Sequence, residues 1–127
     1  MLSKFLHEKQ DYFFFVFRVI VGLLFFLHGW MKVPSIINGT FGLGNLMFYA
    51  GIIETIGGIM IILGLFTKAV AFIAAIEMLG ALFIAHFPSG LNPLANGGEP
   101  ALLFFTSFLV LMTQGAGKWS IDAMRRG

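Results

Sequence analysis

The chain of 127 residues contains no cysteine and few charged residues. Without cysteine it cannot form a disulfide framework, a thiolate zinc site, an iron–sulfur cluster or a thiol active site. Redox centres of those kinds must therefore come from another molecule. Asp, Glu, Lys and Arg make up only 11% of the residues, against about 25% in an average soluble domain. A soluble domain this small needs far more polar surface than these side chains provide.

Hydrophobic residues, by contrast, make up 58% of the chain. This balance predicts that the lipid bilayer surrounds most of the protein. The formal net charge is only +2, and the basic residues form no patch with interleaved aromatic residues. We therefore expect no nucleic-acid partner. We also expect no metal site.

Four apolar segments are each long enough, or nearly so, to cross the hydrocarbon core of a bilayer as a helix. They run over residues 12–31, 47–66, 69–87 and 100–115. Four such helices leave nothing else in the chain against which they could be buried. The sequence therefore predicts an all-α, four-helix transmembrane bundle that forms a single domain, 1–127, in the cell membrane. We expect the first span to stay in the mature protein, because it is too long for a signal peptide and contains Arg18.

Positive charge alternates between the connecting segments. Most of it lies in three segments: the N-terminal segment with Lys4 and Lys9, the second connection with Lys68, and the C-terminal tail with Lys118, Arg125 and Arg126. Positively charged loops stay on the cytoplasmic side of a membrane. Both termini are therefore predicted to be cytoplasmic, with residues 35–46 and 88–98 forming the outer connections.

Several ionisable residues fall inside or near the spans, where a charged group is costly and marks a functional site by default. They are Arg18, Glu54 and Glu77 within the spans, and His28, Lys32, His86 and Glu99 toward their outer ends. A helix rises about 1.5 Å per residue, so these groups form a ladder across the membrane. We expect three pairs at matching heights: Arg18 with Glu77, His28 with Glu54, and Lys32 with Glu99.

Glycines favour an inward orientation for these polar groups. Gly51 and Gly58 flank Glu54 on its helix face, and Gly22 and Gly29 lie on the corresponding side of the first span. Small residues let membrane helices approach closely. An enclosed site holding Arg18, Lys32 and three carboxylates would carry one net negative charge, so we expect either a protonated Glu54 or a charged His28. The alternative is that these polar groups act only as contacts between helices.

Three stretches of the sequence together resemble the DoxX family of small integral membrane proteins. The first has Arg18, Gly22, Phe25, His28, Gly29 and Lys32; the second has Gly51, Glu54, Gly57, Gly58, Leu63 and Gly64; the third has Asn96, Gly97, Glu99, Gly115, Gly117, Ser120 and Asp122. The resemblance implies a four-helix membrane protein associated with quinone-linked oxidoreductases.

The leading hypothesis is a quinone- or quinol-interacting accessory subunit of a membrane oxidoreductase, with no covalently bound cofactor. His28, Glu54 and Arg18 would then be the catalytic residues, because a histidine and a carboxyl group suit proton transfer to and from quinol. Glu77, Lys32 and Glu99 would bind the substrate. Electrons would pass to a partner subunit.

Other functions fit the same residues. His28 and His86 lie at similar heights and could ligate a haem between two helices. Intramembrane carboxylates also mark proton-coupled transporters, for which we would expect a homo-oligomer. A structural or assembly subunit is the remaining possibility.

Overall fold

A computed structural model describes residues 1–126, and every regular element within that range is a helix. The elements are α1 (Leu2–Glu8), α2 (Gln10–Trp30), α3 (Val33–Ile37), α4 (Leu46–Leu63), α5 (Thr67–Ala81), η1 (Leu82–His86), η2 (Phe87–Ser89), α6 (Pro93–Asn96), α7 (Glu99–Gln114) and α8 (Ile121–Arg126). The long helices α2, α4, α5 and α7 correspond to the four predicted spans, so the all-α fold is confirmed.

Two of the predicted boundaries differ from the structure by more than two residues. Helix α4 ends three residues earlier than predicted because Gly64 adopts a left-handed conformation, with φ of 68°, which ends the helix. The third span is α-helical only as far as Ala81. It continues through a π-helical turn, η1, which is wider than an α-helix, and then a 3₁₀ turn, η2, which is tighter.

The outer surfaces of these helices are apolar. Three continuous helical segments, Gln10–Ile37, Leu46–Leu63 and Thr67–Ser89, are long and apolar enough to cross a membrane, while Glu99–Gln114 is shorter. Only 28–33% of the residues in these windows are buried inside the protein. The rest expose large apolar side chains, a surface that requires lipid contact.

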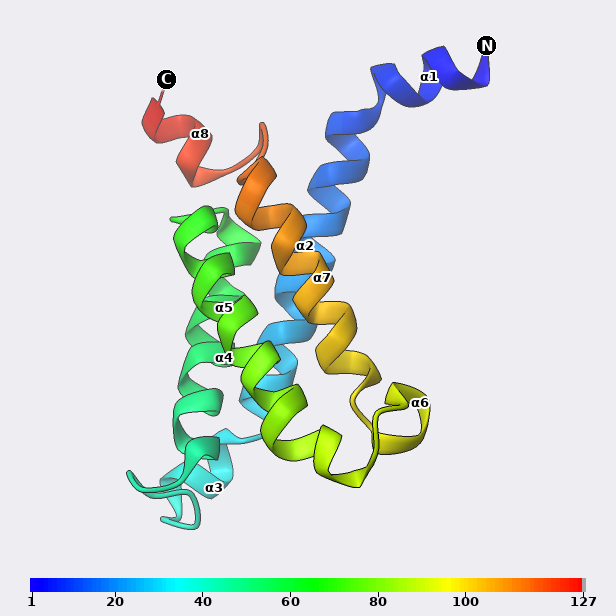
Figure 1. Cartoon of the computed structure of the whole chain (residues 1–127). Coiled ribbons are helices and arrows are strands. Elements are labelled where there is room, and N and C mark those ends of the chain that lie inside the picture. The colour runs from blue at the N-terminus through cyan, green and yellow to red at the C-terminus, as the bar shows by residue number, and fades with distance from the viewer. Residues whose placement is uncertain (127) are drawn as a thin grey trace.

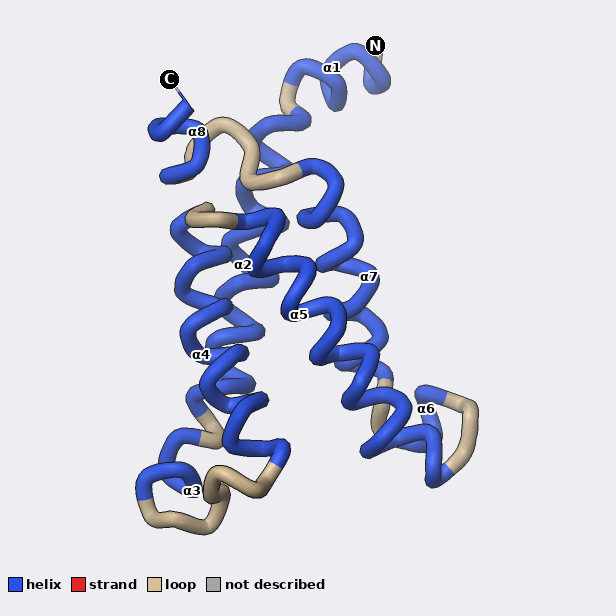
Figure 2. The backbone as a smooth tube through the Cα atoms, turned by 60° about the vertical axis from the view of Figure 1, so that its left-hand side comes forward, coloured by secondary structure: helices blue, strands red, loops and turns tan. Residues whose placement is uncertain are grey.

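The bundle consists of two helix pairs. Helix α2 packs mainly on α4, and α5 packs mainly on α7. Figure 2 shows that the pairs lie close together near the two termini and diverge toward the opposite end, where α3 and α6 lie on separate sides. Phe25 of α2 joins the pairs at the core, with its ring centroid 4.7 Å from that of Phe108 on α7. Toward the divergent end from this contact, a pocket lies between the two pairs.

Glycines set the close contact between α2 and α4. A Cβ atom on Gly22 would lie 2.8 Å from the backbone nitrogen of Ile62, and one on Gly58 would lie 2.5 Å from that of Phe26. Any larger residue would therefore collide with backbone across the crossing. The close approach that was predicted around Glu54 is confirmed.

Both termini lie at the same end of the bundle (Figure 1). The side of the membrane that this end faces stays a prediction, and the absence of native cysteine makes it simple to test. A cysteine at Thr40, in the loop between α3 and α4, should react with a membrane-impermeant maleimide in intact cells. A cysteine at Ser3 should react only after permeabilisation. The reverse pattern would show that the orientation is wrong.

The last helix, α8, supplies the cap for the start of α5, although the two helices are far apart in the sequence. The carboxylate of Asp122 accepts hydrogen bonds from the backbone N–H groups of Phe66, at 2.8 Å, and Thr67, at 2.9 Å. A carboxylate at a helix N-terminus also interacts favourably with the helix dipole. Burial opposes the charge of Asp122, but the two N–H donors and the nearby Arg125 outweigh it, so the pKa of Asp122 lies below its ordinary value.

This lowered pKa predicts acid sensitivity. The charged carboxylate stabilises the fold at every pH above the ordinary aspartate pKa, about 3.9. That contribution is lost as the pH falls through the lower pKa of the folded protein. Thermal unfolding in detergent should therefore show a wild-type advantage over Asp122→Asn that is constant above about pH 5 and disappears in acid. A difference that does not change with pH would contradict this role for Asp122.

Candidate functional site

An ion pair connects the end of α2 to the middle of α4. The ammonium group of Lys32 lies 2.9 Å from Oε1 of Glu54 and donates a second hydrogen bond to the backbone oxygen of His28, at 3.2 Å. Glu54 is buried, with 3% of its surface exposed. A buried carboxylate needs such a partner, because an isolated charge away from water is costly. The pair fixes both side chains at the divergent end of the bundle.

A second carboxyl group reaches the same region from α5. Glu77 lines a common pocket with Lys32 and Glu54. Its Oε1 is buried and has no hydrogen-bond partner, and no cation lies within ion-pair distance among residues 1–126. Oε1 of Glu77 is therefore a buried acceptor in this pocket that no other described group engages.

The pocket has a volume of about 350 Å³ and lies between the two helix pairs. Five ionisable residues line it, namely His28, Lys32, Glu54, Glu77 and His86. The remaining lining residues are apolar or small, and they include Phe25, Met47, Met78 and Phe104. An apolar cavity with a few converging polar groups is the usual form of a small-molecule site.

The two histidines differ in how they are held. The π-helical turn carries His86, whose Nδ1 lies 3.1 Å from the backbone oxygen of Asn96. A carbonyl oxygen only accepts, so Nδ1 carries the proton, and Nε2 of the neutral ring remains an acceptor. His28 packs edge-on against Phe104, with ring centroids 5.3 Å apart, at the exposed rim of the pocket.

Arg18 does not line this pocket. Its guanidinium donates to four backbone oxygens, those of Ile61, Ile62, Ala116 and Trp119, at 2.6–3.1 Å. The first two belong to the last turn of α4, whose carbonyls have no partner within the helix. The other two belong to the segment between α7 and α8. The predicted pair of Arg18 with Glu77 is therefore wrong, and Arg18 joins the ends of two helix pairs.

The other predicted pairings also change. Lys32 binds Glu54 and not Glu99, so the predicted Lys32 and Glu99 pair is wrong. His28 shares the pocket with Glu54 as predicted, but Lys32 is the partner of that carboxylate. Glu99 is exposed and lines a neighbouring pocket of about 320 Å³ between α2 and α7, together with His28. The sequence placed His86 near the end of the third span, with haem ligation as one alternative, and missed that it lines the same pocket as the two carboxyl groups.

The charge count of the pocket explains what it can do. Glu54 and Glu77 together carry two negative charges when ionised, and Lys32 supplies one positive charge. Neutrality then requires one further proton on a carboxyl group or on an imidazole. The sequence predicted this proton on Glu54 or His28. Because Lys32 pairs with Glu54, Glu77 is the carboxyl group of this pocket that has no cation within ion-pair distance among the described residues.

Comparison with known proteins agrees with this architecture. The DoxX family model matches residues 13–87. An uncharacterized protein of Haemophilus influenzae is 39% identical over 125 residues, covering 92% of this chain and 93% of that protein. A Bacillus subtilis protein named "Putative oxidoreductase CatD" is 31% identical, covering 76% and 75% of the two chains.

A membrane protein of Mycobacterium tuberculosis is 27% identical, covering 83% of this chain and 76% of its own length. No solved structure gives a significant match. The family match spans more than half of the chain, and it includes Arg18, His28, Lys32, Glu54 and Glu77. The chain is therefore a member of the DoxX family and an integral membrane protein.

Proposed function

We propose that this protein is a quinone- or quinol-binding accessory subunit of a membrane oxidoreductase. The observation that carries the proposal is the convergence of Lys32, Glu54, Glu77 and His86 from both helix pairs in one mostly apolar pocket. Ionisable groups within a membrane protein are costly and mark a functional site by default. A pocket of about 350 Å³ lies within the range of small-molecule sites, which begins at about 300 Å³.

The donors and acceptors present fit both forms of the substrate. A quinone has two carbonyl oxygens that accept hydrogen bonds, and the ammonium of Lys32 can donate to one of them. A quinol has two hydroxyl groups that donate, and the carboxylate of Glu77 and Nε2 of His86 can accept from them. Quinol oxidation also releases protons, which a carboxylate or an imidazole can take up.

The electrons released in the same reaction must leave the chain. Residues 1–126 contain no cysteine and no cluster of three side chains that could hold a metal ion. We therefore assign electron transfer to the redox centre of a partner protein. The Bacillus subtilis relative bears the name of an oxidoreductase, which supports a place for the family in such systems.

Quinone titration of the purified protein in nanodiscs tests this function. Wild-type protein should bind saturably, as followed by quenching of its tryptophan fluorescence. Glu54→Gln should weaken binding by at least about tenfold, because it removes the counter-ion that positions Lys32. Glu8→Gln, on α1 and far from the pocket, is the matched control and should bind as the wild type does. Equal affinities for Glu54→Gln and wild type would overturn the proposal.

Proton-coupled transport is the second candidate, and one observation favours it. Among residues 1–126, Glu77 has no cation within ion-pair distance, and its pocket adjoins two side pockets, which would suit a carrier of protons. Proteoliposomes distinguish the two functions. A transporter would move protons with its substrate in the absence of any quinone or partner, whereas a quinone-binding subunit would not.

A further inference from the structure

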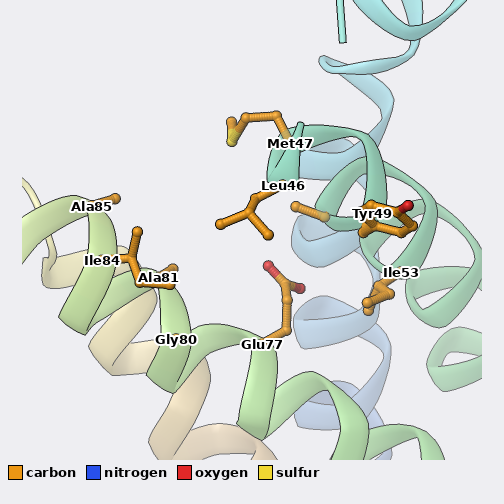
Figure 3. Close-up of a pocket in the computed structure, with 10 residues that line it drawn as sticks. Leu46, Met47, Tyr49, Ile53, Glu77, Gly80, Ala81, Ile84 and Ala85 are labelled. Atoms are coloured by element: carbon orange, nitrogen blue, oxygen red, sulfur yellow. The ribbon is translucent and has the colours of Figure 1, made fainter. Parts of the chain in front are cut away.

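A second pocket, here called the lateral opening, lies between α4 and α5 and adjoins the central pocket. The opening has a volume of about 270 Å³, and it shares five lining residues with the central pocket: Met47, Ala50, Glu77, Ala81 and Ala85. The two spaces therefore adjoin each other. Figure 3 shows the carboxyl group of Glu77 pointing into this opening, toward Leu46 on the facing helix.

Apart from Glu77, the opening offers an apolar surface. The hydroxyl of Tyr49 is already engaged, because it donates to the backbone oxygen of Leu43 at 2.7 Å. On the α5 side the residues are small, and a Cβ atom on Gly80 would meet nothing within 4 Å. The opening is thus wide at Gly80 and lined by hydrocarbon from both helices.

The size of the central pocket leaves no room for a long ligand. Its volume of about 350 Å³ lies at the lower limit for small-molecule sites, which range from about 300 to 1,000 Å³. It can hold a single ring, so a hydrocarbon chain on that ring would have to lie elsewhere. The other side pocket, between α2 and α7, is lined by Glu99, Ser107 and His28 as well as by bulky apolar residues, and it suits such a chain less well.

We infer that the ligand of the central pocket is a quinone with a long hydrocarbon tail, and that it enters from the bilayer between α4 and α5. This inference rests on the proposed function and names the entry route and the tail site. The ring passes Gly80, reaches Glu77 first and then comes within range of Lys32 and His86. The tail stays in the opening, in contact with Leu46, Ile53 and Ile84.

Two probes with the same benzoquinone ring, one with a decyl chain and one without a chain, test in nanodiscs whether the tail lies in the opening, as entry between α4 and α5 requires. The quantity measured is the affinity of the decyl probe divided by that of the chainless probe. Comparing this ratio between each variant and the wild type cancels the general preference of the tail for lipid. Gly80→Phe should lower this ratio by at least about tenfold, the worth of roughly two buried methylene groups. Ile84→Trp, at the rim of the same opening, should lower it in the same direction and decides the test if Gly80→Phe fails to fold.

Ser107→Phe places the same bulk in the side pocket between α2 and α7, and it should leave the ratio unchanged. A wild-type ratio in a folded Gly80→Phe variant, or an equal loss in Ser107→Phe, would overturn the tail site, and the entry route with it, while leaving quinone binding in place. If neither probe binds the wild-type protein, the proposed function itself fails and the route fails with it.

Discussion

Replacing Arg18 by methionine is expected to lower the free energy of unfolding by about 3–5 kcal/mol, more than any other single side-chain removal outside the apolar core. Arg18 is 1% exposed and donates to four backbone oxygens. Each hydrogen bond from a charged donor contributes about 1.5–3 kcal/mol, and the contributions are not additive. Methionine is a long, uncharged side chain that donates no hydrogen bond, so the carbonyl groups of Ile62, Ala116 and Trp119 lose their donor, while that of Ile61 keeps the N–H of Gly64. Thermal unfolding in detergent measures the loss.

Two further variants distinguish the effect of the four guanidinium hydrogen bonds from the effect of the positive charge. Arg18→Lys keeps the charge but cannot reach four separate oxygens, so it should lose about half as much stability. Lys118→Met removes a basic residue from the same end of the bundle, where its ion pair with Asp11 is solvent-exposed, and should cost less than about 1 kcal/mol. If Arg18→Met unfolds at the wild-type temperature but loses quinone binding, Arg18 belongs to the binding site and the structural role described here is wrong.

Gly29→Ala is the second change with a large expected effect, because Gly29 lies where α2 crosses α4. A Cβ atom there would collide with the backbone nitrogen of Thr55 and lie 2.7 Å from the carbonyl carbon of Glu54. Backbone atoms in the middle of a helix cannot move aside as a flexible side chain can. We expect a loss of about 3 kcal/mol, at the upper end of what overpacking usually costs. The displaced Glu54 should also weaken quinone binding.

Gly80→Ala provides the matched control, since both glycines lie within transmembrane helices. A Cβ atom on Gly80 meets nothing within 4 Å. Replacing a helical glycine by alanine without a collision usually stabilises a protein by about 0.5–1 kcal/mol. The two variants should therefore shift the unfolding temperature in opposite directions. Equal shifts would show that the crossing at Gly29 is looser than described.

The fold could be predicted from the sequence because lipid imposes simple constraints. Long apolar segments without a soluble body must become membrane helices, and glycines at regular spacing mark where such helices touch. The structure confirms the long helices, and it confirms the close helix contacts at Gly22 and Gly58. The π-helical turn that carries His86 could not be predicted, because nothing in the local sequence distinguishes it from a continued α-helix. The early end of α4 had a visible signal in Gly64.

The site was predicted less well, and the reason is geometric. The heights assigned to each residue describe Cα positions along parallel helices, whereas the two helix pairs diverge and Lys32 has a long, flexible side chain. Lys32 therefore reaches Glu54, which the height argument had paired with His28. Arg18 was paired with Glu77 because a buried cation is expected to lie near a buried anion at a similar height. Its actual partners are backbone oxygens at and beyond helix ends. Every residue has such an oxygen, so the sequence does not indicate which of them Arg18 will bind.

Photolabelling with an azidoquinone tests most directly whether the pocket between the helix pairs is the binding site. After irradiation in nanodiscs, mass spectrometry of the peptides identifies the labelled residues. We predict labels on Met47, Met78 and His86, which line the pocket from α4, α5 and η1 and whose labelling an excess of unlabelled quinone should suppress. Labels confined to lipid-facing residues such as Phe72 and Phe83, with no suppression by unlabelled quinone, would contradict the account.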